Sequence, residues 1–210
     1  MNIKLDLIYK RLYRYFGPQH WWPAKTVFEV MVGAILTQNT SWNNVKKAID
    51  NLKKKKFLEP SRLYRLSHKR LALFIKPAGY YNIKAKRLKE FLSFLFKSYK
   101  GNLRTMTRED TQELREKLLS VNGIGQETAD SILLYALKKP VFVVDAYTKR
   151  ILWRHRFIKE DSHYEEIQNL FMKNLKKDVR LFNEYHALLV KLGKDFCLKR
   201  KPKCDICPLK

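Results

Sequence analysis

The chain has 210 residues, 45% of them hydrophobic, so it can bury a core and is not a disordered tail. Lysine and arginine number 44 against 20 acidic residues, a formal charge of +24, which favours a polyanionic partner such as DNA. A lysine-rich surface without such a partner would give the same balance. The first 17 residues mix charges with apolar positions, which argues against a signal peptide, and no early apolar run could span a bilayer. We therefore expect a cytoplasmic, nucleoid-associated protein with no membrane partner.

Apolar residues recur at helical spacing along nearly the whole chain, and only the short run Val141–Val144 suggests extended backbone. Thr107 and Ser162 each stand three residues before an acidic residue, the capping-box pattern of a helix start. The sequence therefore predicts an all-α protein, with helix ends uncertain by about 2 to 4 residues. The predicted helices cover residues 3–15, 25–38, 41–55, 61–66, 69–76, 82–98, 109–119, 127–137, 146–156, 163–175 and 181–193.

The most informative stretch is 121–130, Val-Asn-Gly-Ile-Gly-Gln-Glu-Thr-Ala-Asp, followed by the run 141–144 and Asp145. A turn at Gly123, Ile124 and Gly125 that opens a helix leaves outward backbone N–H groups, which suit a phosphate oxygen. Asp145 can be read as the N-cap of the next helix, or as a carboxylate placed to stabilise a developing positive charge. Phosphate binding and a carboxylate in one short unit indicate an enzyme that acts on DNA.

Four segments, in this order, resemble the endonuclease III superfamily of DNA glycosylases. They are Leu-Thr-Gln-Asn-Thr at 36–40, Gly-Tyr-Tyr-Asn-Ile-Lys-Ala at 79–85, the helix-hairpin-helix with its Asp at 121–145, and a cysteine loop at 197–207. The resemblance implies a helix-hairpin-helix glycosylase fold with two helical lobes, a DNA-binding cleft between them and a C-terminal cysteine loop. One domain would be residues 21–136, with the hairpin, and the other residues 1–20 and 137–210. A monomer that binds double-stranded DNA containing a damaged base is expected.

The same resemblance implies roles for individual residues. Asp145 matches the catalytic carboxylate, beside which the sugar gains oxocarbenium character. Gln38 and Tyr80 match residues that fill the gap left by a flipped nucleotide, although Tyr80 could instead pack beside its neighbour Tyr81. Glu127 stands where bifunctional members carry a lysine nucleophile. Because a carboxylate cannot form an imine, AP lyase activity is not expected.

Glu127 and the segment 36–40 are together similar to the bacterial 3-methyladenine DNA glycosylase III branch. Trp21, Trp22 and Trp42 match aromatic positions of that branch and would stack on a cationic alkylated purine, with packing in the core as the alternative. The resemblance implies hydrolysis of the N-glycosidic bond of alkylated purines such as 3-methyladenine. The alternatives are a bifunctional glycosylase/AP lyase on oxidised pyrimidines, a mismatch thymine/uracil glycosylase, and a non-catalytic DNA-binding module. His186 reads as a core residue.

Three cysteines, Cys197, Cys204 and Cys207, have the spacing that in this family implies a [4Fe–4S] cluster. The fourth cysteine of that spacing would fall beyond the last residue of this sequence. A trimmed chain, an outside ligand or a degenerate site would each account for this, and zinc, which also takes four ligands, is the alternative metal. The loop carries four cations expected to contact the DNA backbone, at Lys199, Arg200, Lys201 and Lys203.

Overall fold

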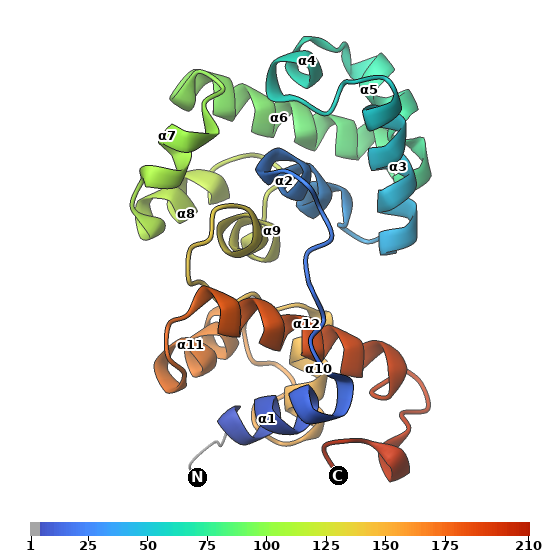
Figure 1. The fold of residues 1–210 in the computed structure, drawn as a ribbon, viewed down its shortest axis with the longest axis vertical. Helices are drawn as coiled ribbons and strands as arrows, with labels where there is room; N and C mark the ends of the chain where they lie inside the picture. The colour runs from blue at the N-terminus through green and yellow to red at the C-terminus, as the bar shows by residue number, and fades with distance from the viewer. Residues whose placement is uncertain (1–4) are drawn as a thin grey trace. The chain divides into compact units, whose positions relative to one another are not determined.

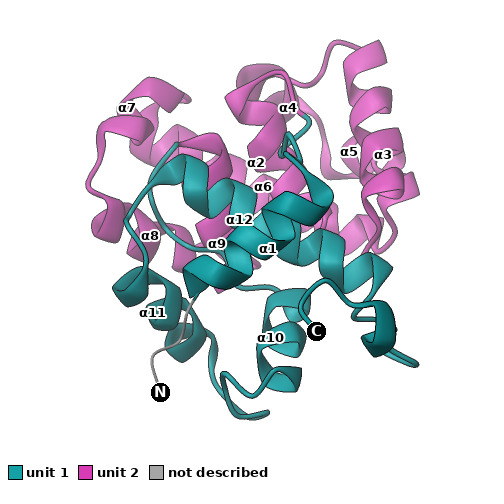
Figure 2. Ribbon diagram, turned by 60° about the horizontal axis from the view of Figure 1, so that its bottom comes forward, with its two compact units in different colours: residues 1–23, 138–210 teal, residues 24–137 magenta. Residues whose placement is uncertain are grey.

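The computed structural model describes residues 5–210, and within them the chain is helical with no strand (Figure 1). The predicted all-α fold is therefore confirmed. Each helix of these residues is too short or too polar to cross a membrane. The described chain divides into two compact units (Figure 2): unit 1 runs up to Pro23 and resumes at Lys138–Lys210, and unit 2 is Ala24–Leu137. The predicted domain boundaries lay after residues 20 and 136 instead.

The helices of unit 2 are α2 (Val27–Leu36), α3 (Trp42–Lys54), α4 (Pro60–Arg65), α5 (His68–Phe74), η1 (Lys76–Ala78), α6 (Tyr81–Tyr99), α7 (Leu103–Arg108), α8 (Thr111–Leu119), α9 (Gln126–Ser131) and η2 (Ile132–Ala136). Those of unit 1 are α1 (Leu5–Phe16), α10 (Ala146–Arg154), α11 (Tyr164–Asn174), α12 (Val179–Asp195) and η3 (Cys204–Ile206).

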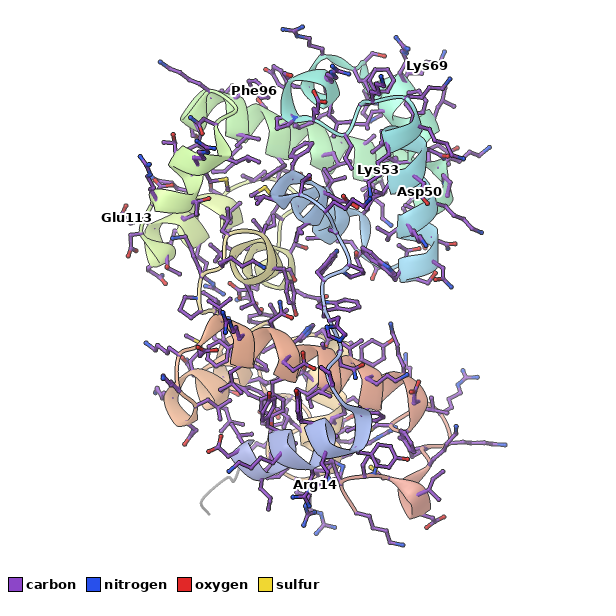
Figure 3. The ribbon with its side chains drawn as sticks, in the orientation of Figure 1. Arg14, Asp50, Lys53, Lys69, Phe96 and Glu113 are labelled. Atoms are coloured by element: carbon purple, nitrogen blue, oxygen red, sulfur yellow. The ribbon has the colours of Figure 1, made fainter. Side chains whose placement is uncertain are left out.

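Unit 2 is built around α2, which is apolar almost throughout and buried from Phe28 to Leu36. At its start the Thr26 hydroxyl accepts from the Glu29 N–H at 3.1 Å, so a hydroxyl caps the helix. The Glu29 carboxylate is buried and pairs with Lys53 Nζ on α3 at 2.5 Å. On α6, Phe96 stacks on Tyr64 of α4, with ring centroids 4.4 Å apart. Figure 3 labels Lys53 and Phe96. These contacts join α2 to α3 and α4 to α6.

Unit 1 packs α10 and α1 against α12. Tyr185 of α12 is buried and donates its hydroxyl to the Leu5 carbonyl of α1 at 3.0 Å. Gly193 of α12 lies so close to α10 that a Cβ there would stand 2.4 Å from the Tyr147 ring. The run 141–144 is buried, and Phe142 within it stacks on Phe171 of α11 at 3.7 Å. This extended segment thus lies in the core without pairing as a strand.

Two predicted helix caps were wrong, although α8 and α11 start within the stated uncertainty of the predicted positions. Thr107 does not cap a helix, because it lies inside α7, a helix the sequence reading missed, and its hydroxyl donates to the Leu103 carbonyl. Asp110 caps α8 instead and accepts from two N–H groups of the first turn. At α11 the cap is His163, one residue later than predicted, and its N–H donates to the Glu166 carboxylate at 3.2 Å.

Candidate functional site

The hairpin consists of α8 and α9 with the turn between them, and an ion pair joins its two helices. Arg115 of α8 donates from Nε and from a terminal nitrogen to the two carboxylate oxygens of Asp130 on α9, at 2.7 and 3.1 Å. The Asp130 side chain is fully buried and that of Arg115 is 12% exposed. A bidentate pair shielded from water holds the two helices in one orientation.

The two glycines of the turn have different environments. Gly123 has φ +87°, which disfavours any other residue, and a Cβ there would lie 2.3 Å from Arg87 Cγ. Gly125 has φ −94°, and a Cβ there would meet no atom within 4 Å. The Ile124 N–H donates to the Val121 carbonyl at 3.0 Å, and its side chain is buried. The turn was expected to leave backbone N–H groups pointing outward, but that of Ile124 is used inside the turn.

Gln38, just beyond the end of α2, contacts the hairpin directly. Its side-chain amide nitrogen donates to the Gly123 carbonyl at 3.0 Å and to the Thr128 hydroxyl at 2.9 Å. Its amide oxygen accepts from the Arg87 guanidinium at 2.5 Å. Sequence reasoning proposed a DNA contact for Gln38 but did not foresee these internal bonds, because they join residues 49 to 90 positions apart.

Tyr80 does not pack as a core residue, since 69% of it is exposed. It has φ +45°, caps α6 and follows Gly79, which has φ +68°. The buried Lys84 ammonium donates to the Ala78 carbonyl at 2.7 Å, at the start of this turn. Burial, together with the Arg87 charge, lowers the pKa of Lys84 to about 8. The turn thus exposes the Tyr80 ring to solvent, and the buried Lys84 ammonium holds the backbone that carries this ring.

Asp145 lies at the start of α10 in unit 1 and is almost completely buried. Its Oδ1 accepts from the Thr148 N–H at 2.7 Å, so the N-cap reading is confirmed. The segment that precedes it is held by α11 through two bonds: the Phe142 carbonyl accepts from Gln168 at 2.7 Å, and the Val144 N–H donates to the Tyr164 hydroxyl at 3.3 Å. The carboxylate therefore has a fixed position.

His186 of α12 is the neighbour of Asp145 that sequence reasoning missed. Its ring Nε2 lies 3.6 Å from Asp145 Oδ2, and it is buried, as a core histidine was expected to be. Burial opposes ionisation of Asp145, but His186 and the Thr148 N–H outweigh it and hold the pKa of the carboxyl below its usual range. No local pattern marks His186, because a single His on an apolar helix face is an ordinary core residue.

Comparison with known proteins identifies the family of the chain. Residues 32–177 match the model of the HhH-GPD superfamily of base excision DNA repair proteins. The chain belongs to this superfamily of DNA glycosylases. It is 54% identical, over 97% of its length and 92% of the relative's, to a Methanocaldococcus jannaschii protein assigned as a DNA repair glycosylase.

Two solved structures are similar to this glycosylase. The first is an H. pylori 3-methyladenine DNA glycosylase bound to 1,N6-ethenoadenine, with TM-score 0.78 and 30% identity, covering 90% of this chain and 97% of that one. The second is endonuclease III in a trapped covalent intermediate with DNA, with TM-score 0.84 and 21% identity, covering 100% of this chain and 93% of that one. The second likeness concerns the fold alone.

The aromatic residues expected in the base pocket of this glycosylase lie in both units. Trp21 and Trp22 are in unit 1, each half-buried, with ring centroids 5.3 Å apart. Trp42 is the first residue of α3 in unit 2 and is also half-buried. None of the three is a fully buried core residue. Their joint role in base recognition stays a prediction.

The three cysteines do not form a metal site in the part of the chain described. Cys197 is buried, Cys204 is exposed and Cys207 is half-buried. Across residues 5–210, no three His, Cys, Asp or Glu side chains converge on one point. The loop is instead held by Arg150 and Arg154 of α10, which donate to the carbonyls of Gly193, Cys197, Leu198 and Lys199 at 2.6 to 3.0 Å. Three cysteines in the described residues are one fewer than the four ligands that a [4Fe–4S] cluster or zinc takes, so the metal stays a prediction and we derive no reaction step through it.

The four cations predicted to contact DNA all lie on the surface of the cysteine loop. Lys199, Arg200, Lys201 and Lys203 are exposed. Arg154 fixes the backbone at their start by donating to the Lys199 carbonyl at 3.0 Å. Four positive charges on a held loop suit a polyphosphate backbone.

Proposed function

We propose that this glycosylase is monofunctional and hydrolyses the N-glycosidic bond of alkylated purines such as 3-methyladenine in double-stranded DNA. The observation that carries the proposal is Asp145, an ionised and almost completely buried carboxylate at the start of α10 in a DNA glycosylase. Glu127 of α9 stands where the resemblance places the lysine nucleophile of bifunctional members. The H. pylori 3-methyladenine DNA glycosylase, 30% identical over 90% of this chain, supports the substrate class.

The chemistry follows from charge. As the bond to the base breaks, the sugar gains oxocarbenium character, and a fixed carboxylate beside it lowers the energy of that state. Asp145 is held by Thr148 and His186, so it need not reorganise as charge develops. Water then takes the place that an amine nucleophile would have in a lyase. An alkylated purine carries positive charge, which suits stacking on Trp21, Trp22 or Trp42.

The test is a base-release assay on duplexes that contain 3-methyladenine, an oxidised pyrimidine, or thymine or uracil in a mismatch. We expect release of the alkylated purine, an intact abasic strand and no adduct on borohydride treatment. The Asp145→Asn variant should bind the duplex and release nothing, whereas Asp161→Asn, an exposed acid elsewhere in unit 1, should act as wild type.

Each other outcome selects an alternative. A borohydride-trapped adduct with release of oxidised pyrimidines would make the chain a bifunctional glycosylase/AP lyase, and release of mismatched thymine or uracil alone would change the substrate. Binding without any release would leave a DNA-binding module. Iron analysis and the visible absorbance of the same preparation check the [4Fe–4S] prediction, and size-exclusion chromatography checks the monomer.

A further inference from the structure

We infer that Arg87 of α6 is a positioning residue for the hairpin turn and that it acts through Gln38. Its consequence for DNA binding rests on the proposed function, but its effect on the turn does not. The inference starts from the Gln38 amide, which bonds the Gly123 carbonyl within the turn and the Thr128 hydroxyl in the first turn of α9. Gly125, where the turn is most open, lies between these two points.

Arg87 orients this amide. A glutamine amide has two N–H donors and one oxygen acceptor. The Gly123 carbonyl can only accept and the Arg87 guanidinium can only donate, so together they turn the amide nitrogen toward the hairpin and the amide oxygen toward α6. Without Arg87, the amide oxygen loses this partner and the amide is held through its nitrogen alone.

Arg87 also contacts the turn through its methylene groups. The Cγ and Cδ atoms occupy the space where a Cβ on Gly123 would stand, at 2.3 and 2.9 Å from it. Gly123 is therefore required by its left-handed φ and by the arginine stem above it. Arg87 thus packs directly on Gly123 and, through Gln38, helps to hold both Gly123 and Thr128.

A turn held before DNA arrives loses less conformational entropy on binding, so it binds more tightly. The same bonds bear on the predicted wedge role of Gln38. Its side chain is bonded to three hairpin and α6 groups and would have to leave all of them to enter a duplex. In the DNA-free protein, Gln38 therefore connects α2 and α6 to the hairpin.

The test compares Arg87→Met with Lys86→Met in the full chain. Both remove one positive charge from α6, but Lys86 is exposed and, as the preceding residue, lies on a different face of the helix. Hydrogen exchange without DNA should be faster at residues 122–128 in Arg87→Met by about tenfold or more, and unchanged in α3. Affinity for an undamaged duplex should fall by about tenfold in Arg87→Met and by less than about threefold in Lys86→Met.

Three further variants keep the result interpretable if Arg87→Met unfolds. Gln38→Met should give the same local exchange increase, and adding Arg87→Lys to it should change exchange little further, because the amide through which Arg87 acts is already absent. Arg87→Lys alone, which keeps charge and stem, should restore part of the protection. Equal exchange in Arg87→Met and Lys86→Met would overturn the inference. Faster exchange without any DNA binding in the wild type would instead reject the proposed function alone.

Discussion

Asp145 keeps its charge in a buried place because two neighbours favour the carboxylate. Burial alone raises the pKa of Asp145, and His186 and the Thr148 N–H lower it by more. In the His186→Leu variant the burial remains while one of the lowering interactions is removed, so the pKa rises. We predict that the acid limb of the rate of base release moves to higher pH. Single-turnover rates from about pH 3 to 8 would measure it, a range that begins below the ordinary Asp value of about 3.9.

A matched change separates this effect from general destabilisation. His163→Leu alters another histidine of unit 1, at the start of α11, and should leave the acid limb where it is. If the limb of His186→Leu coincided with that of the wild type, His186 would have no electrostatic effect on Asp145.

The two turn glycines give a second prediction at the residue scale. Gly123→Ala meets the Arg87 stem and puts Ala in a left-handed conformation, which costs about 1–2 kcal/mol before any clash. Gly125→Ala meets open space and should change the free energy of unfolding by less than about 0.5 kcal/mol. If Gly125 lies against a phosphate, its Ala variant should nonetheless bind DNA less tightly. Chemical denaturation and duplex titration of both variants check this.

At the scale of single residues, the sequence predicts which side chains have a chemical role better than it predicts which side chains contact one another. Asp145 can be recognised from its local pattern, because an acidic residue that follows a buried apolar run and caps a helix can lie only at the start of that helix. His186 does not, since its partner comes from another helix. The bonds of Gln38 join α2, α6 and the hairpin, and residue type does not reveal such partners.

At the scale of elements, the hairpin depends on the buried pair Arg115–Asp130. Asp130→Asn leaves a guanidinium largely buried without its counter-charge, and breaking such a pair costs about 3–5 kcal/mol. We predict a decrease of this size in the free energy of unfolding, measured by urea denaturation. The exposed pair Arg62–Glu59 provides the control, and Glu59→Gln should cost less than about 1 kcal/mol. Equal decreases would mean that burial does not set the strength of these pairs.

Most helices can be predicted from the helical spacing of apolar residues. Helix α7 is the exception, and the reason is local. Helix α7 is not predicted because Thr107 and Asp110 fit the capping-box pattern, which places a helix start where α7 ends. The signal for α7 was Asn102, whose side chain accepts from the N–H groups of Arg104 and Thr105 at 2.9 and 3.4 Å. Two adjacent cap signals, at Asn102 and Asp110, bound one short helix between them.

At the scale of the whole molecule, the division into units does not follow from local patterns. Unit 1 joins the start of the chain to its end through contacts such as that of Tyr185 with the Leu5 carbonyl, 180 residues apart. Helical periodicity indicates that a face is buried and not which distant helix covers it. Only the resemblance to a family predicted a discontinuous unit.

The charge of +24 gives the last prediction, which concerns the binding of this glycosylase to DNA. Each phosphate neutralised releases counterions, so the logarithm of affinity falls with the logarithm of salt by about 0.9 per neutralised phosphate. Changing Lys199, Arg200, Lys201 and Lys203 to Gln should reduce this slope by roughly 0.9 for each phosphate that the loop no longer neutralises.

The control variant removes the same charge from another exposed region, with Gln at Lys46, Lys47, Lys54 and Lys55 along α3. If the cysteine loop contacts the DNA backbone, the loop variant has a clearly smaller salt slope than the wild type. The slope of the α3 variant changes less, because charges that do not contact a phosphate act on DNA only through an electrostatic field that salt screens. Fluorescence titrations of an undamaged duplex between low and physiological salt measure both slopes. Equal slopes in the two variants would mean that the charge attracts DNA from the surface as a whole and that the loop makes no contact of its own.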